Sequence, residues 1–171
     1  RGARRGDALA VDAVRLVPVG IRIAAAGAGR LNGSFEAGLD GWNGYSANLV
    51  RVAQTGAPDG SYVVKVARTG SGSSYVLQES SRVGPLAAGA RYAASVWVKA
   101  GSASSAGRTI QIKLREWNAA GNPVADTASA PIGLGTSWRR ITVSATTRTA
   151  GGSLDLRVSQ KGAAPGHFFF A

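Results

Sequence analysis

The feature that most constrains this chain is an alternation of apolar and polar residues with a period of two. It recurs in nine short segments, separated by clusters of Gly, Pro, Asn and Ser, and helical periodicity is almost absent. Successive side chains of a strand point to opposite faces, so this period predicts half-buried β-strands. The predicted strands are 8–18, 48–54, 61–68, 74–82, 90–100, 108–117, 137–146, 153–160 and 166–171. Many short strands at even spacing predict an all-β chain, an antiparallel sandwich or barrel.

Composition narrows the class of protein further. A chain of 171 residues suits one domain with a sizeable core. The sequence has no Cys, so disulfides play no part, and it has no apolar run long enough to cross a bilayer. The formal net charge is +11, but the 20 Lys and Arg residues are scattered apart from a cluster at Arg1, Arg4 and Arg5. Since no nucleic-acid-binding motif accompanies the charge, we expect neither nucleic acid nor membrane insertion.

Several motifs stand in one order along the chain. They are LNGSFEAGLDGW (31–42), PDGSYVVKV (58–66), YVLQES (75–80), GPLAAGARYAASVWVKA (84–100), IQIKLREWNAAGN (110–122), TSWRRITVSAT (136–146), SLDLRVSQ (153–160) and GHFFFA (166–171). The ordered set resembles the jelly-roll carbohydrate-binding modules of families 4, 9 and 22, which have a galactose-binding-like architecture. The resemblance covers residues 31–171 and implies a two-sheet antiparallel jelly-roll sandwich that binds a polysaccharide without catalysis.

The resemblance also implies a structural calcium ion. In such modules the Glu after the NGxF motif, carbonyl groups of a Gly turn and an Asp on the last strand are the ligands. Glu36 matches the first position, and the turn at Asp59 matches the second. Aligning 8–17 with the last strand of the family places Asp12 at the third. Calcium takes six to eight oxygen ligands, so a site without the third carboxylate would be incomplete. The alternative is that Glu36 is a solvated or capping acid.

Strand parity sorts the candidate sugar-binding residues. In 108–117 the side chains of Gln111, Arg115 and Trp117 lie on the polar face of the strand. In 90–100 the side chain of Trp97 lies on the polar face of its strand. The resembled modules bind sugar in a groove on the outer face of one sheet, where aromatic rings stack on sugars and polar groups bind hydroxyls. The predicted ligand-binding residues are therefore Trp97, Trp117, Gln111, Arg115 and Gln78.

An alternative for these rings is a second small core beneath loops, because exposed Trp lowers solubility. Trp42 follows a Gly turn as an anchoring aromatic residue, Trp138 stands at the start of a strand, and both are predicted to be structural. The outer faces also carry basic residues, so an acidic polysaccharide is one expected ligand. These residues are Arg91, Lys99, Lys113, Arg115 and Arg157.

Catalysis is not expected. His167 is the one histidine, and no nucleophile motif accompanies it. Glu116 beside Trp117 imitates the acid of a glycosidase, but by parity it points to the core. A glycosidase also needs a second carboxylate at a defined separation.

The first residues predict a place in a larger assembly. We expect 1–19 to be a strand resembling the end of a preceding module, 20–30 to be a linker, and 31–171 to be a sandwich whose last strand is truncated. One explanation is a tandem array in a larger secreted, cell-surface or phage-tail protein. The other is complementation, in which 8–18 pairs with the open edge of its own or a neighbouring domain. The competing function is thus a structural or assembly module, such as a filament subunit or spacer.

Overall fold

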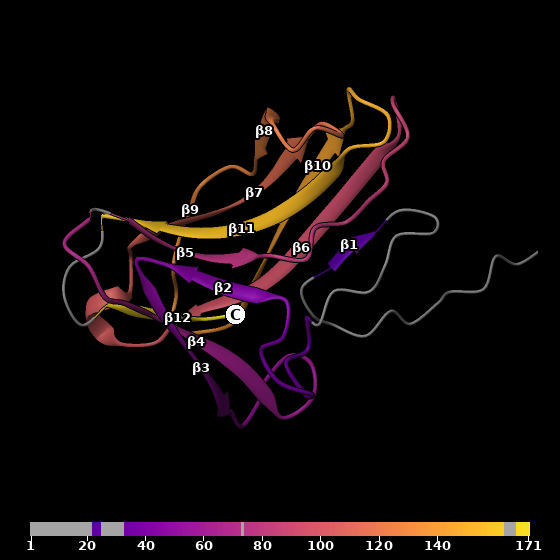
Figure 1. The fold of residues 1–171 in the computed structure, drawn as a ribbon. Helices are drawn as coiled ribbons and strands as arrows, with labels where there is room; N and C mark the ends of the chain where they lie inside the picture. Colours follow the sequence, from indigo (N-terminus) through magenta and orange to yellow (C-terminus); the bar gives the residue numbers. More distant parts are fainter. Residues whose placement is uncertain (1–21, 25–32, 73, 163–166) are drawn as a thin grey trace, which may run out of the picture.

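The computed structural model describes residues 22–24, 33–72, 74–162 and 167–171, and in them two antiparallel sheets pack face to face (Figure 1). The first, here the β6 sheet, has the order β1 (Arg22–Ala24), β6 (Arg91–Ala100), β12 (Phe168–Phe170), β4 (Tyr62–Arg68) and β3 (Ala47–Ala53), and β10 (Arg139–Thr146) also pairs with β6. The second, the β7 sheet, has the order β2 (Trp42–Tyr45), β5 (Ser74–Glu79), β11 (Ser153–Lys161), β7 (Thr109–Trp117) and β8 (Pro123–Ala128), and β9 (Ile132–Gly133) also pairs with β7.

The predicted fold class is confirmed, since the chain forms a two-sheet antiparallel jelly-roll sandwich. Eight of the nine predicted strands are observed within a few residues of their predicted bounds, and 8–18 lies outside the described residues. Across these residues the helical content is one short 3-10 turn, η1 (Ala103–Ser105), and no helix is long and apolar enough to span a membrane.

Four strands were not predicted. β2, β8 and β9 are short, and β8 begins with a proline at the exposed edge of its sheet, where a missing amide is tolerated. The prediction of a linker at 20–30 was wrong for Arg22–Ala24, which forms β1. This strand is three residues long, which is too short to show an alternation in the sequence.

The core lies between the two sheets and is made by the apolar face of each alternating strand. In β7 the side chains of Ile110, Ile112 and Leu114 are at most 1% exposed. Burying a side chain of this size stabilises the fold by about 1.5–3 kcal/mol. Tyr75 and Phe169 connect the sheets with ring centroids 5.5 Å apart. Trp42 is 6% exposed and its ring centroid lies 5.6 Å from that of Phe35, which confirms its structural role.

The strands β12 and β1 lie one after the other along the same edge of β6. β10 pairs with residues 91–98 on one edge of β6, so β1, which pairs with 93–95, must occupy the other. β12 pairs with Lys99 and Ala100, and Ala171 follows it with two hydrogen bonds of 3.1 Å to the backbone of Val64 in β4. Because Phe170 lies opposite Lys99, the same register places Ala171 opposite Val98, whereas Arg22 lies opposite Ser95. Along this edge, Ala171 and Arg22 are therefore separated by the two positions opposite Trp97 and Val96. Figure 1 shows β1 beside β6, beyond the end marked C.

Candidate functional site

The candidate site is the outer face of the β7 sheet, called the outer β7 face below. The register places Gln78 of β5 opposite Arg157 of β11, and Arg115 of β7 opposite Asp155 of β11. Residues paired directly across an antiparallel sheet share a face. The predicted residues on this face are therefore Gln78, Gln111, Arg115 and Trp117, and the strand β2 adds Asn43 and Tyr45.

Trp117 is held at one end of this face by polar contacts. Its indole nitrogen donates a hydrogen bond of 2.8 Å to the carboxylate of Asp155, which is 1% exposed. The guanidinium of Arg157 donates two further bonds to Asp155, of 3.0 and 3.1 Å. The guanidinium of Arg82 lies 3.8 Å from the centroid of the Trp117 ring. The ring is thus half-buried and fixed in orientation, and the guanidinium of Arg82 lies over one of its faces.

A second cluster of charges fixes the polar side chains of β7. Asp126 of β8 accepts two hydrogen bonds from Arg115, of 2.7 and 2.9 Å, and one of 2.9 Å from Lys113. The two hydrogen bonds from Arg115, and after them the one from Lys113, hold the pKa of Asp126 well below its usual range. The carboxylate therefore stays ionised, and both cationic side chains are held in place before any ligand arrives.

Tyr45 is an aromatic residue of this face that sequence reasoning missed. It is 66% exposed, and it lies opposite Val76 in a row that continues to Ser159 and Gln111. The parity of WNGY would have placed it outward once Trp42 was assigned to the core, but β2 itself was not predicted. Tyr45 is an exposed platform at the corner of the face opposite Trp117.

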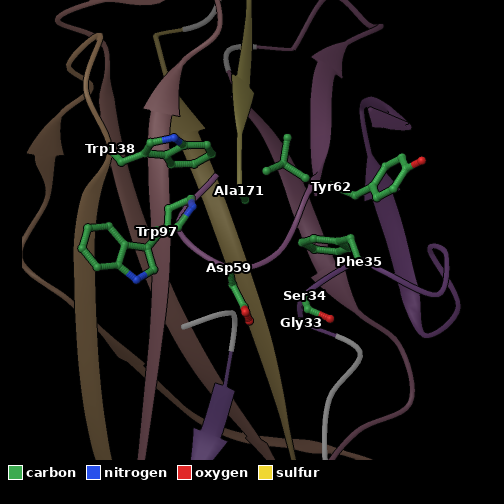
Figure 2. Close-up of a pocket in the computed structure, with 10 residues that line it drawn as sticks. Gly33, Ser34, Phe35, Asp59, Tyr62, Trp97, Trp138 and Ala171 are labelled. Carbon is green, nitrogen blue, oxygen red and sulfur yellow. The ribbon is translucent and has the colours of Figure 1, made fainter. Parts of the chain in front are cut away.

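The assignment of Trp97 to the same face as Trp117 was wrong. β6 and β7 belong to different sheets, and parity shows that a side chain points outward without showing from which sheet. Figure 2 shows Trp97 and Trp138 on one side of a small pocket, Tyr62 and Phe35 on the other, and Ala171 between them. The pocket volume is about 20 Å³, enough for one water molecule and too small for a sugar ring. Trp97 is therefore a packing residue.

Two residues discussed for catalysis, Glu116 and His167, are buried. Glu116 is 4% exposed and lies on the core side, as parity predicted. Its Oε1 accepts bonds of 2.8 Å from the amides of Arg148 and Thr149, and one of 2.9 Å from the Thr149 hydroxyl. His167 is 3% exposed, and burial lowers the pKa of its imidazole.

The predicted calcium ligands Glu36 and Asp59 lie in adjoining loops. Oε1 of Glu36 accepts hydrogen bonds from the amides of Ser61, at 2.9 Å, and Tyr62, at 2.8 Å. A Cβ added to Gly60 would overlap this carboxyl group, so glycine permits the close approach. Within the described ranges no group of three acidic or histidine side chains could hold a metal ion, and Asp12 lies outside them. The described residues alone do not make a calcium site.

We predict that Trp97→Ala lowers the stability of the domain. The substitution removes a ring that lines the small pocket together with Trp138 and Ala171, and truncating a large half-buried ring costs about 2–3 kcal/mol. In a chain of this size, the expected fall in melting temperature is roughly 5–10 °C. Trp97→Phe, which retains most of the packing, should lose less. An unchanged melting temperature for Trp97→Ala, measured by differential scanning calorimetry, would contradict the packing role.

Comparison with known proteins shows the family to which the chain belongs. Residues 28–165 match the model of a carbohydrate binding domain family. No curated protein sequence matches the chain. Solved structures share its fold at low identity. The CBM22-1 xylan-binding domain of Paenibacillus barcinonensis Xyn10C is 16% identical, with a TM-score of 0.62. The match covers 90% of this chain and 92% of that one.

Two further structures carry the fold inside larger proteins. The CBM22-1–GH10 modules of Clostridium thermocellum endo-1,4-β-D-xylanase 10B, complexed with xylohexaose, are 19% identical with a TM-score of 0.62, and 80% of this chain covers 26% of that one. The enzymatically active domain of tailspike protein 4 of bacteriophage CBA120 is 11% identical with a TM-score of 0.57, and 77% of this chain covers 18% of it. With a family model matched over most of its length, this chain belongs to the carbohydrate binding domain family.

Proposed function

We propose that this domain is a noncatalytic carbohydrate-binding module that binds a polysaccharide of the xylan class on the outer β7 face. The observation that carries the proposal is the arrangement of this face, with Tyr45 and Trp117 at opposite corners and fixed polar side chains between them. Similar structures supply the ligand class, because one is named a xylan-binding domain and another is complexed with xylohexaose.

The dimensions of the face suit an extended sugar chain. Three strand spacings separate β2 from β7, which is about 14 Å, and the row of Tyr45 lies six residues along β7 from Trp117, which is about 20 Å. The two rings therefore stand roughly 25 Å apart on a diagonal. Aromatic rings offer apolar contact to sugar faces, and Gln78, Gln111 and Arg115 offer hydrogen bonds to hydroxyls between them. Side chains already held by Asp126 lose little entropy on binding.

The same face gives little support to hydrolysis. Its described carboxylates are Asp126 and Asp155, and both are ion-paired with cationic side chains. Glycoside hydrolysis needs a proton-donating carboxyl group and a second carboxylate beside the bond that breaks. A carboxylate held ionised by two cations is a poor proton donor, which supports a binding role.

We further propose that the module works within a larger secreted, cell-surface or virion protein. The similar structures support this, since one accompanies a xylanase catalytic module and another is part of a phage tailspike. This chain spans only about a quarter of the length of the first of these proteins.

A structural calcium ion is proposed at Glu36 and the turn at Asp59, on condition that Asp12 completes the ligand set. Calcium that binds the folded state alone raises the melting temperature. We expect chelation with EDTA to lower the melting temperature of the chain, and Asp12→Asn to remove this response. A melting temperature that is the same with calcium and with EDTA would exclude the site.

Strand exchange between copies is the second candidate function, and the pairing of β1 favours it. β1 is bound to β6 through three residue pairs, and the β1 of a second copy would make the same pairs, as in domain swapping. We expect the amides of Ala93 and Ser95 to exchange hydrogen slowly. Ile23→Pro, which breaks β1, should expose them and remove any oligomer seen by light scattering. Monomers at every concentration would exclude exchange, and unchanged amide protection in Ile23→Pro would exclude the pairing.

We predict that Tyr45→Ala and Trp117→Ala each weaken xylohexaose binding about five- to tenfold, because each removes a stacking ring. Since the face is long, xylohexaose should also bind more tightly than xylobiose. Val50→Ala, which removes an exposed apolar side chain from the β6 sheet, is the control and should bind normally. Isothermal titration calorimetry measures all of these. Unchanged affinity in both aromatic variants would exclude this face as the site.

A further inference from the structure

A polar hollow adjoins the Trp117 end of the outer β7 face. Its volume is about 380 Å³, and its walls are the loops 81–85, 118–121 and 151–153. Ser153 in its wall pairs with Trp117, and Gly152 passes so close that an added Cβ would overlap the Trp117 carbonyl group. The hollow therefore continues the surface of the outer β7 face beyond its aromatic end, and a ligand on Trp117 would have direct access to it.

The charge of the hollow comes from one side chain. Among its described lining residues Arg82 is the one that is charged, and the others are Ser, Asn, Gly, Ala and Pro. Arg82 is exposed, and in the described part of the chain no carboxylate forms an ion pair with it. Arg157 on the same sheet is ion-paired with Asp155, and Arg115 shares the carboxylate of Asp126 with Lys113. Arg82 thus presents an unpaired guanidinium beside the sugar-binding face.

The position of Arg82 is imposed by the turn that precedes it. Its φ of +50° is in the left-handed region, which a residue with a bulky side chain rarely adopts. Its amide donates a hydrogen bond of 2.8 Å to Oε2 of Glu79, which is 1% exposed. Such strained backbone persists where neighbouring groups hold it, and it is concentrated at functional sites. The turn and the Trp117 ring together hold the guanidinium at the mouth of the hollow.

We infer that Arg82 and this hollow form a subsite for the carboxylate of an acidic sugar residue on the bound polysaccharide. A guanidinium stacked on a ring still presents its N–H groups in its own plane, and there they match the two oxygens of a carboxylate. The serine and asparagine side chains of the wall supply hydrogen-bonding groups for sugar hydroxyls. The inference rests on the proposed function of the outer β7 face and specifies its substrate class as xylan bearing uronic acid.

The test compares two forms of one polymer. Glucuronoxylan and its carboxyl-reduced form share a backbone and differ in whether the side sugar carries a carboxylate. We expect the full chain to bind the native form about three- to tenfold more tightly in affinity electrophoresis at low salt. The preference should diminish at high salt, because the Arg82 pair is partly exposed. Arg82→Gln should reduce the ratio to near one, and Arg82→Lys should restore part of it.

Controls separate the two proposals. Arg91→Gln removes another exposed arginine, from the β6 sheet, and should keep the preference of the parent chain. Equal binding of both polymers by the parent chain would overturn the inference and leave the outer β7 face as a neutral xylan site. A preference retained in Arg82→Gln would assign it to other cations and would also overturn the inference. Failure to bind either polymer would instead refute the proposed function.

Discussion

The structure depends on the burial of one carboxylate, that of Asp155, on the central strand of the β7 sheet. An ionised carboxylate is costly to remove from water unless it is paired and hydrogen-bonded. Here the Trp117 indole and the Arg157 guanidinium supply the partners. Removing either one would leave a buried charge incompletely compensated. The need to compensate this buried charge therefore also fixes the orientation of the Trp117 ring, and the proposed sugar-binding face depends on that ring.

The charges of the outer β7 face differ in whether they are already satisfied. Arg115 and Lys113 are bound to Asp126 of the neighbouring strand β8, and Arg157 is bound to Asp155 of its own strand, so the contribution of these cations to a ligand is chiefly geometric. Arg82 lies on a turn instead of a strand, and a ring supports it instead of an acid. A net charge of +11 thus says little about recognition. What matters is which cations lack a partner at the site.

The two tryptophans predicted as a pair have different roles. Trp97 and Trp117 each stand on the polar side of an alternating strand, but one lines a pocket of about 20 Å³ and the other a face about 25 Å long. The neighbours of Trp97 come from the loop before β10, from β4 and from the end of β12, which are distant in sequence. Its packing partners therefore followed from strand order and not from local pattern.

The sequence by itself determined the eight longer or apolar strands that were predicted and their core faces, because a period of two is a local property of a half-buried strand. It also placed Gln78, Gln111, Arg115 and Trp117 outward and Glu116 inward. Only the tertiary structure decided which strands are neighbours, and so it separated Trp97 from Trp117, added Tyr45, and brought Arg82 over the Trp117 ring. It also placed β1 beside β6, where a linker was predicted. These relations depend on pairing between segments far apart in the chain, and the pattern within one segment carries no information about its partner.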